Sequence, residues 1–552
     1  MRLNFFIRGE TMDVLAGFSN VVKDYINMLF KSKKYCIIYL VLILIFGLST
    51  VGKKNFSNPS FVILTFIVVA IIGIFCIIYY FLHDSDEELY KVAFVFIICF
   101  GIVCALIVPI CDVSDEIEHL TRAEITSQGV IIPHWTGEDK GVEGLYNHTE
   151  GERISSEKNS GVGFESISAM NFFSSSLGRT VFYTNHDTDK ISYNLTIIES
   201  AFEQNPFFGY LPQAIGILIA KFLDLNVIWI LWLARICNLL FYAGVVSLAV
   251  RKTPVLKIPL LAVACIPISM YQASSASIDA MIISLSILAI SYFIYMCKSP
   301  KDSLSQKDIA IFSVICIFLG LCKLPYLAFI FLLLFVPSKN FKMERKNSYL
   351  IILCAIILVS IIGLLWSRYS APTLLHSWRS SHNLINSTMQ FNHVLNHPSR
   401  IGKFIYNIFI LDLPHILIGV FSFFGALQFH HYVDRYYLVT SALLLYLAVT
   451  LFAYPRNVEF ELKTKIGSAL IILGIYIGTC FIQLLTWASV GYYNLGISTR
   501  YFVPLFALLP VVVWIKINPM DGKKFDNYAI VLMVVFMATM IISFATKYYA
   551  FV

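Results

Sequence analysis

VAFVFIICFGIVCALIVPI extends from Val92 to Ile110 without a charged side chain, and CDVSDEIEHLTR follows directly, from Cys111 to Arg122. The first part is nearly long enough to cross roughly 30 Å of hydrocarbon as a helix. The second part gathers carboxylates, an imidazole and a guanidinium where that crossing would end. The stretch therefore predicts a membrane helix with an ionisable cluster at the membrane surface.

The composition indicates the same class for the whole chain. Hydrophobic residues make up 58% and charged residues 14%, whereas soluble domains carry about 25% charged residues. No P-loop or nucleotide-binding glycine motif is present, which argues against an ATP-driven transporter, and no nucleic-acid partner is expected. We expect an all-α, multi-pass membrane protein with about thirteen transmembrane helices, at residues 35–52, 60–82, 91–110, 226–250, 256–271, 277–297, 308–322, 325–337, 348–366, 434–454, 466–489, 500–516 and 527–547.

Basic loops predict the orientation. Lys and Arg collect at residues 251–257, 298–301, 339–346, 456–465 and 516–524, so these loops should face the cytoplasm. Residues 111–206 carry 16 acidic and 6 basic residues, as an external loop would. The chain then divides into a cytoplasmic arm (1–34), helices 1–3 (35–110), a large external loop with the acid cluster (111–206), helices plus one interfacial segment (207–366), a second external loop with a re-entrant or interfacial segment (367–433) and C-terminal helices (434–552). Within the first loop, residues 137–163 are expected to form a mobile lid.

The ionisable cluster has the spacing of one helical face. Asp112, Asp115, His119 and Arg122 recur every three or four residues, and Glu116 points about a quarter-turn away. Such a face could perform acid/base chemistry on a charged substrate. The alternative is an ordinary solvated helix start.

Further polar residues lie at the ends of other expected spans. Asp279 opens one from the outer side, Lys323 interrupts two short helices, and Arg500 begins another. Each alone could be a snorkelling or hydrogen-bonded packing residue. Together with Asp115 they are predicted to lie at one membrane depth and to form a site.

These residues also carry a resemblance. Ser114-Asp-Glu-Ile-Glu-His119-Leu-Thr-Arg122 resembles the P-D-E-x-x-H-x-x-R signature of a family of largely uncharacterised bacterial membrane proteins, grouped with the GT-C glycosyltransferases. Ser114 and Ser498-Thr499 depart from the family pattern, and Phe424–Leu427 matches it only loosely. Further matches follow in the family's order between about 105 and 510: Tyr210-Leu-Pro212, Arg235 with Asn238, Pro267, Ser277-Ile-Asp279, Lys323-Leu-Pro325-Tyr326 and Arg500-Tyr501-x-x-Pro504.

The resemblance implies a GT-C-like helical bundle with interfacial helices in its external loops. It also implies a polyprenyl-phosphate-linked sugar donor and a glycan, lipid or protein hydroxyl as acceptor, at the outer face of the cell membrane. Asp115 would be the base, Glu116 its substitute, and His119 would orient the base. Asp112 and Glu116 could ligate a divalent metal such as Mg or Mn. Phosphate or sugar would be bound by Arg122, Asp279, Lys323, Arg500 and Tyr501.

Two other classes remain open at this point. A lipid-linked sugar flippase or transporter would use the same cations without a base, and a polysaccharide polymerase would join two lipid-linked chains. The acid cluster and the lack of an internal repeat favour the transferase.

Overall fold

The computed structural model describes residues 3–51, 58–134, 164–183, 189–198, 202–375, 385–421, 436–456, 458–515 and 521–550. Helices dominate these ranges, as expected for an all-α membrane protein. In chain order the elements are α1 (Leu3–Val51), α2 (Pro59–Leu82), α3 (Leu89–Ile107), α4 (Glu116–Ser127), β1 (Phe164–Ile167), α5 (Met170–Ser175), η1 (Val181–Tyr183), β2 (Leu195–Ile198), η2 (Phe207–Tyr210), α6 (Leu211–Phe222), α7 (Ile228–Lys252), α8 (Lys257–Cys265), α9 (Pro267–Ala273), α10 (Asp279–Lys298), α11 (Gln306–Cys322), η3 (Leu324–Phe335), η4 (Ser338–Asn340), α12 (Arg345–Leu375), α14 (Ser387–Asn396), α15 (Ser399–Tyr406), η5 (Asn407–Asp412), α16 (Leu413–Phe421), α17 (Tyr437–Phe452), α18 (Leu462–Thr486), η7 (Thr499–Phe502), α19 (Val503–Phe506), α20 (Leu509–Val512) and α21 (Gly522–Tyr549).

Nine helical stretches in the described ranges are long and apolar enough to cross a membrane. The expected count of thirteen is therefore not confirmed. The expected span at 256–271 is divided at Pro267, and the one at 500–516 is divided into η7, α19 and α20, which contain Pro504 and Pro510. Proline has no N–H for the helical ladder, which explains these breaks. At 308–322, 325–337 and 434–454 the elements are 17, 12 and 16 residues long.

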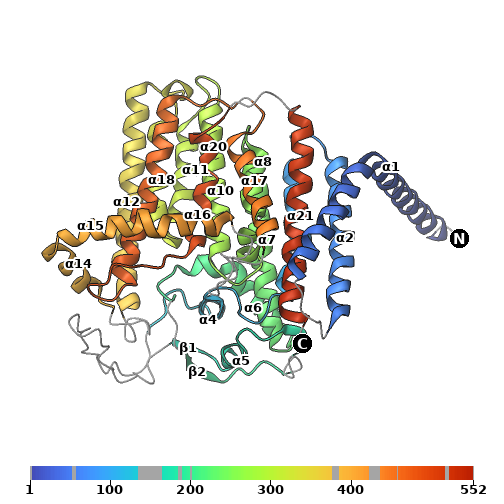
Figure 1. Cartoon of the computed structure of the whole chain (residues 1–552), viewed down its shortest axis with the longest axis horizontal. Helices are drawn as coiled ribbons and strands as arrows, with labels where there is room; N and C mark the ends of the chain where they lie inside the picture. The colour runs from blue at the N-terminus through green and yellow to red at the C-terminus, as the bar shows by residue number, and fades with distance from the viewer. Residues whose placement is uncertain are drawn as a thin grey trace.

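Two segments were expected not to span. Around 207–223 the structure has η2 and the 12-residue α6, too short for a crossing. In the second segment, residues 399–420 are long and apolar enough to cross. However, α15 and α16 run across the direction of α12 and α18 (Figure 1), which fits an interfacial position better.

The buried centre of the bundle contains α10 and α21. Their most apolar windows are 89% and 94% buried, whereas that of α12 is 22% buried. Helix α12 therefore lies at the periphery, where it would face lipid. The start of α10, which carries Asp279, lies in the interior.

The predicted basic loops meet at one end of the bundle. Asp86, between α2 and α3, pairs with Arg456 and accepts a hydrogen bond at its carbonyl from Lys257. Arg456 also pairs with Asp526 at the start of α21. The remaining contacts at this end join Lys523 to Asp84, Lys298 to the Glu459 carbonyl, and Lys339 to Glu461.

The opposite end contains α4, α5, α6 and the antiparallel pair of strands β1 and β2, with the C-terminus beside them (Figure 1). Buried Glu124 of α4 connects three elements at this end, because it pairs with Lys221 of α6 at 2.7 Å and accepts a hydrogen bond from Ser166 of β1. The predicted lid at 137–163 lies outside the described residues. The described basic loops thus lie at the end of the bundle opposite to α4 and α6.

Candidate functional site

A fully buried ion pair fixes the frame of the site. Arg235 of α7 binds Glu116, the first residue of α4, through two parallel hydrogen bonds of 2.8 and 2.7 Å. Its other N–H groups donate to the carbonyls of Ala105, Val108 and Pro109 at 2.8–2.9 Å. All five guanidinium donors are therefore used, and they hold the end of α3 and the start of α4 on α7.

The same clamp holds the segment before α10. Glu116 accepts a hydrogen bond from the backbone N–H of Ala276 at 2.9 Å. Asn238, one turn after Arg235 on α7, donates to the Ser275 carbonyl at 2.7 Å. The small side chains at 273–277 allow the Glu116 carboxylate to approach this backbone closely. Together these bonds fix where α10 begins.

Arg500 lies between two carboxylates. Its side chain is 3% exposed and pairs with Asp115, the residue before α4, and with Asp279, the first residue of α10. The contact with Asp279 is an ion pair of 3.0 Å whose atoms are not aligned as a hydrogen bond. A further N–H donates to the Ser114 carbonyl at 2.9 Å. Asp115 has φ +61°, a left-handed conformation that aspartate tolerates better than most residues.

Lys323 supplies a second cation beside Arg500. It lies between α11 and η3, and its ammonium group is 3.0 Å from the ring centroid of Tyr501. No ion pair found in the described ranges involves Lys323. Burial lowers the pKa of Lys323 to about 7, and the Asp279 carboxylate limits that decrease. This lysine is therefore poised to change charge near neutral pH.

His119 is held by aromatic neighbours. Its Nδ1 is 2.7 Å from the Tyr210 hydroxyl, and its ring stacks on Phe202 with centroids 4.4 Å apart. The Asn205 amide donates to the Tyr210 oxygen at 2.9 Å, so the phenolic proton is directed to Nδ1 and the imidazole proton lies on Nε2. Burial lowers the pKa of His119 to about 4. At neutral pH His119 is thus an uncharged hydrogen-bond donor.

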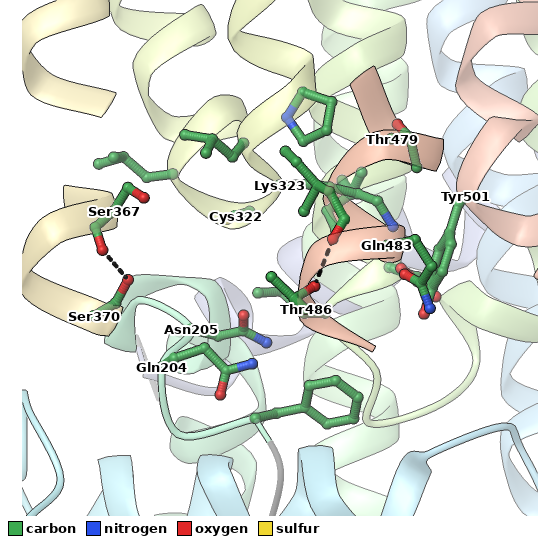
Figure 2. A pocket seen from close by; sticks show the side chains of 18 of the residues that line it. Gln204, Asn205, Cys322, Lys323, Ser367, Ser370, Thr479, Gln483, Thr486 and Tyr501 are labelled. Atoms are coloured by element: carbon green, nitrogen blue, oxygen red, sulfur yellow. Dashed lines mark hydrogen bonds between the residues drawn. The ribbon is translucent and has the colours of Figure 1, made fainter. Parts of the chain in front are cut away.

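These groups meet at a cavity of about 240 Å³. Figure 2 shows part of its lining, including Lys323 and Tyr501. Five of the predicted site residues line it: His119, Asp279, Lys323, Arg500 and Tyr501. The other lining residues are Phe202, Gln204, Asn205, Ile278, Ile282, Leu321, Cys322, Leu324, Pro325, Trp366, Ser367, Ser370, Thr479, Ile482, Gln483, Thr486 and Trp487. The cavity combines a charged wall with a larger apolar and uncharged polar wall.

The remaining predicted residues lie behind this wall. Asp115 pairs with Arg500, which lines the cavity, but Asp115 itself is not part of the lining. Glu116 is buried in its ion pair with Arg235. Arg122 donates to Thr126 at 2.7 Å and to the carbonyls of Ile131 and Asn205. It therefore supports the loop that carries Phe202 and Asn205 from behind.

The predicted metal ligands have protein partners. Asp112 accepts hydrogen bonds from the hydroxyls of Tyr271 and Tyr548, and Glu116 is bound to Arg235. Within the described part of the chain, no three His, Cys, Asp or Glu side chains are arranged to hold a metal ion.

The sequence did not single out the uncharged part of the cavity. Gln204, Trp366 and the Gln483–Trp487 pair come from three separate segments, and no sequence spacing connects these segments. Tyr210, which orients His119, was noted only through the family resemblance. Such residues become recognisable only when α12, α18 and the loop before η2 are brought together.

Comparison with known proteins gives one finding. A family model described as "Predicted membrane protein (DUF2142)" matches residues 98–509, which include every residue of the site. Neither the curated proteins nor the solved structures gave a significant match. The chain therefore belongs to the DUF2142 family of predicted membrane proteins.

Proposed function

We propose that the protein is a GT-C-type glycosyltransferase that moves a sugar from a polyprenyl-phosphate donor to a hydroxyl acceptor. The observation that carries the proposal is the cavity in which Arg500 and Lys323 lie beside Asp279, with Asp115 on the far side of Arg500. Two cations with a carboxylate beside them suit a substrate that contains both a phosphate and a hydroxyl to be deprotonated.

The chemistry assigns a role to each group. The acceptor oxygen attacks the anomeric carbon, the bond from that carbon to the phosphate oxygen breaks, and the phosphate leaves with the electron pair. Arg500 and Lys323 stabilise that charge, and Tyr501 positions Lys323. A carboxylate beside Arg500 receives the acceptor proton: the family resemblance assigns this role to Asp115, and Asp279, which lines the cavity, is its closest competitor. His119 donates a hydrogen bond from Nε2 to the substrate.

The proposal places the site on the outer face of the cell membrane. It is supported by the gathering of basic loops at the opposite end of the bundle. Lys190 and Lys301 offer a test, because both are exposed and they lie in segments predicted on opposite sides. In intact cells, Lys190→Cys should react with a membrane-impermeant thiol reagent and Lys301→Cys should not. The reverse pattern would place the site in the cytosol.

A reconstitution experiment tests the activity. The full chain in liposomes is given a radiolabelled polyprenyl-phosphate sugar, and the release of free polyprenyl phosphate is measured together with transfer of label to added glycans. A glycosyltransferase releases polyprenyl phosphate in step with labelled product, and Arg500→Ala abolishes both. A flippase would move the intact donor between leaflets without releasing polyprenyl phosphate, and that result would reject the proposal.

A further inference from the structure

The cavity has a charged half and an uncharged polar half, and the two meet where Gln483 lies beside Lys323. Its charged side chains in the described ranges, Asp279, Lys323 and Arg500, lie together. The rest of its polar lining is uncharged and consists of amides and hydroxyls from three segments: Gln204 and Asn205 before η2, Ser367 and Ser370 on α12, and Thr479, Gln483 and Thr486 on α18. Figure 2 shows Gln204 and Asn205 between the Ser367–Ser370 pair and the group of Lys323, Gln483 and Tyr501.

Thr479 has an unused hydrogen-bonding group in this half. Its side chain is 4% exposed, and within the described residues its hydroxyl has no hydrogen-bond partner. Helical threonines commonly donate to the carbonyl four residues earlier, as Thr486 does to Ile482 at 2.8 Å. A buried hydroxyl without a partner costs free energy, about 1–3 kcal/mol. A ligand in the cavity would supply the missing bond.

The neighbouring carboxamides are available too. Gln483, one turn after Thr479, and Gln204 make no side-chain hydrogen bond to other described residues, and both reach the cavity. Each carboxamide offers two donors and one acceptor. Trp366 and Trp487 add flat apolar surfaces to the same lining. Amides that both donate and accept, combined with indole rings, match the hydroxyls and the C–H face of a sugar ring.

We propose that this half of the cavity is a subsite for a single uncharged pyranose, the sugar linked to the phosphate that Lys323 and Arg500 bind. The inference rests on the proposed function and specifies its substrate class as a polyprenyl-phosphate-linked neutral hexose. A uronic acid would bring a second negative charge to a cavity whose two cations, Lys323 and Arg500, are already engaged by the phosphate, so desolvation of its carboxylate is unfavourable. The uncharged subsite therefore selects against acidic sugars.

Binding to the full chain in nanodiscs tests the proposal. The probes are farnesyl phosphate, farnesyl-phosphoryl glucose and farnesyl-phosphoryl glucuronate. The readout is the Kd from calorimetric titration at about pH 5, where the phosphate of farnesyl phosphate carries one negative charge, as the phosphodiesters do. The glucose probe should bind about tenfold more tightly than farnesyl phosphate, the value of one or two additional hydrogen bonds. The glucuronate probe should gain nothing over farnesyl phosphate.

Two variants test whether the uncharged half of the cavity causes the tighter binding of the glucose probe. Thr479→Val keeps the side-chain shape, and Gln483→Leu removes the carboxamide; each should remove most of the advantage of the glucose probe and leave the Kd of farnesyl phosphate unchanged. Thr539→Val is the matched control, because Thr539 is buried in α21 with its hydroxyl bonded to Val535. Its Kd values should equal those of the parent.

The outcomes separate the subsite from the proposed function. Equal binding of farnesyl phosphate and the glucose probe would overturn the subsite, and so would tighter binding of the glucuronate probe. Binding of farnesyl phosphate that depends on Arg500 would still support the donor site in that case. Conversely, a glucose-dependent gain that requires Thr479, without turnover of any lipid-linked sugar, would support the subsite and reject the transferase.

Discussion

Among the residues that the structure describes, two buried arginines, Arg235 and Arg500, pair with carboxylates, and their surroundings differ. Arg235 uses all five donors on Glu116 and three carbonyls, and neither it nor Glu116 lines the cavity. Arg500 pairs with Asp115 and Asp279 and faces the cavity. The first group is closed to any ligand, whereas the second is open to one.

The difference indicates whether a buried charged residue stabilises the fold or belongs to a ligand-binding site. A buried ion pair with every hydrogen bond satisfied contributes mainly to defining one arrangement of helices. An arginine whose contact to a carboxylate is imperfectly aligned, as that of Arg500 to Asp279 is, retains capacity to bind another anion. Substitutions at the first pair should therefore affect folding, and substitutions at the second should affect turnover.

The largest effect is expected at the closed pair. Arg235→Met leaves Glu116 buried without its cation, which should cost about 3–5 kcal/mol of folding free energy. We expect loss of folded protein, measured as detergent-soluble yield and thermal unfolding temperature. Adding Glu116→Leu should restore part of the yield, because no unpaired charge remains. A single Arg235→Met variant as stable as the parent would contradict the role of this pair.

At the open group, Asp115→Asn should remove turnover and leave folding and donor binding intact. Loss of a general base lowers rates by about 10² to 10⁴. Asp279→Asn is the matched comparison, because Asp279 pairs with the same arginine but lines the cavity. Near-normal turnover in Asp115→Asn together with loss in Asp279→Asn would transfer the base to Asp279. Normal turnover in both would reject a carboxylate base at Arg500.

A smaller effect is expected for Arg500→Lys, which keeps the charge but loses the planar fork of donors. If Arg500 stabilises the leaving phosphate, turnover should decrease about 10- to 100-fold while donor affinity changes little, because the interaction strengthens in the transition state. The measurement is kcat and donor Kd in liposomes, with Arg500→Ala for comparison. Turnover equal to that of the parent would remove Arg500 from the reaction.

The sequence predicted the class of fold because membrane helices depend on local composition. Most of the apolar run at 92–110 lies in α3, which ends at Ile107, and the basic loops gather at one end as expected. The number of spans was less predictable. Proline breaks and short helices such as α8 and α17 depend on neighbours that cover the exposed backbone, and a window of hydropathy does not show those neighbours.

For the site, spacing on one helix was a partial guide. The structure brings Asp279, Lys323 and Arg500 together with His119, but the helical face drawn from Asp112 to Arg122 is divided between different surroundings. The chain bends into a left-handed conformation at Asp115, so α4 begins after that residue and an ideal helix does not place it. Which carboxylate meets which arginine was therefore decided by tertiary contacts.

The smallest effect, and the sharpest distinction between the two arginine groups, is expected from pH. Lys323 has a pKa of about 7 because it is buried, so its charge disappears as the pH rises from 6 to 8. The groups that face it are Asp279, Arg500 and Asp115, together with His119, which remains neutral above a pKa of about 4. A phosphodiester donor keeps its charge over this range. Donor KM should therefore rise with pH, approaching a tenfold increase for each unit above the pKa.

Lys323→Arg tests whether Lys323 causes the rise of donor KM with pH, because a guanidinium stays charged between pH 6 and 8. In this variant donor KM should be nearly constant between pH 6 and 8, while the parent shows the rise. Folding stability of the parent should rise with pH over the same range, because folded Lys323 releases its proton above a pKa of about 7 whereas an unfolded lysine keeps it, and this rise should be absent in Lys323→Arg. A parent KM that is flat with pH, or a slope that persists in Lys323→Arg, would show that Lys323 does not bind the phosphate and would leave Arg500 as the cation that recognises it.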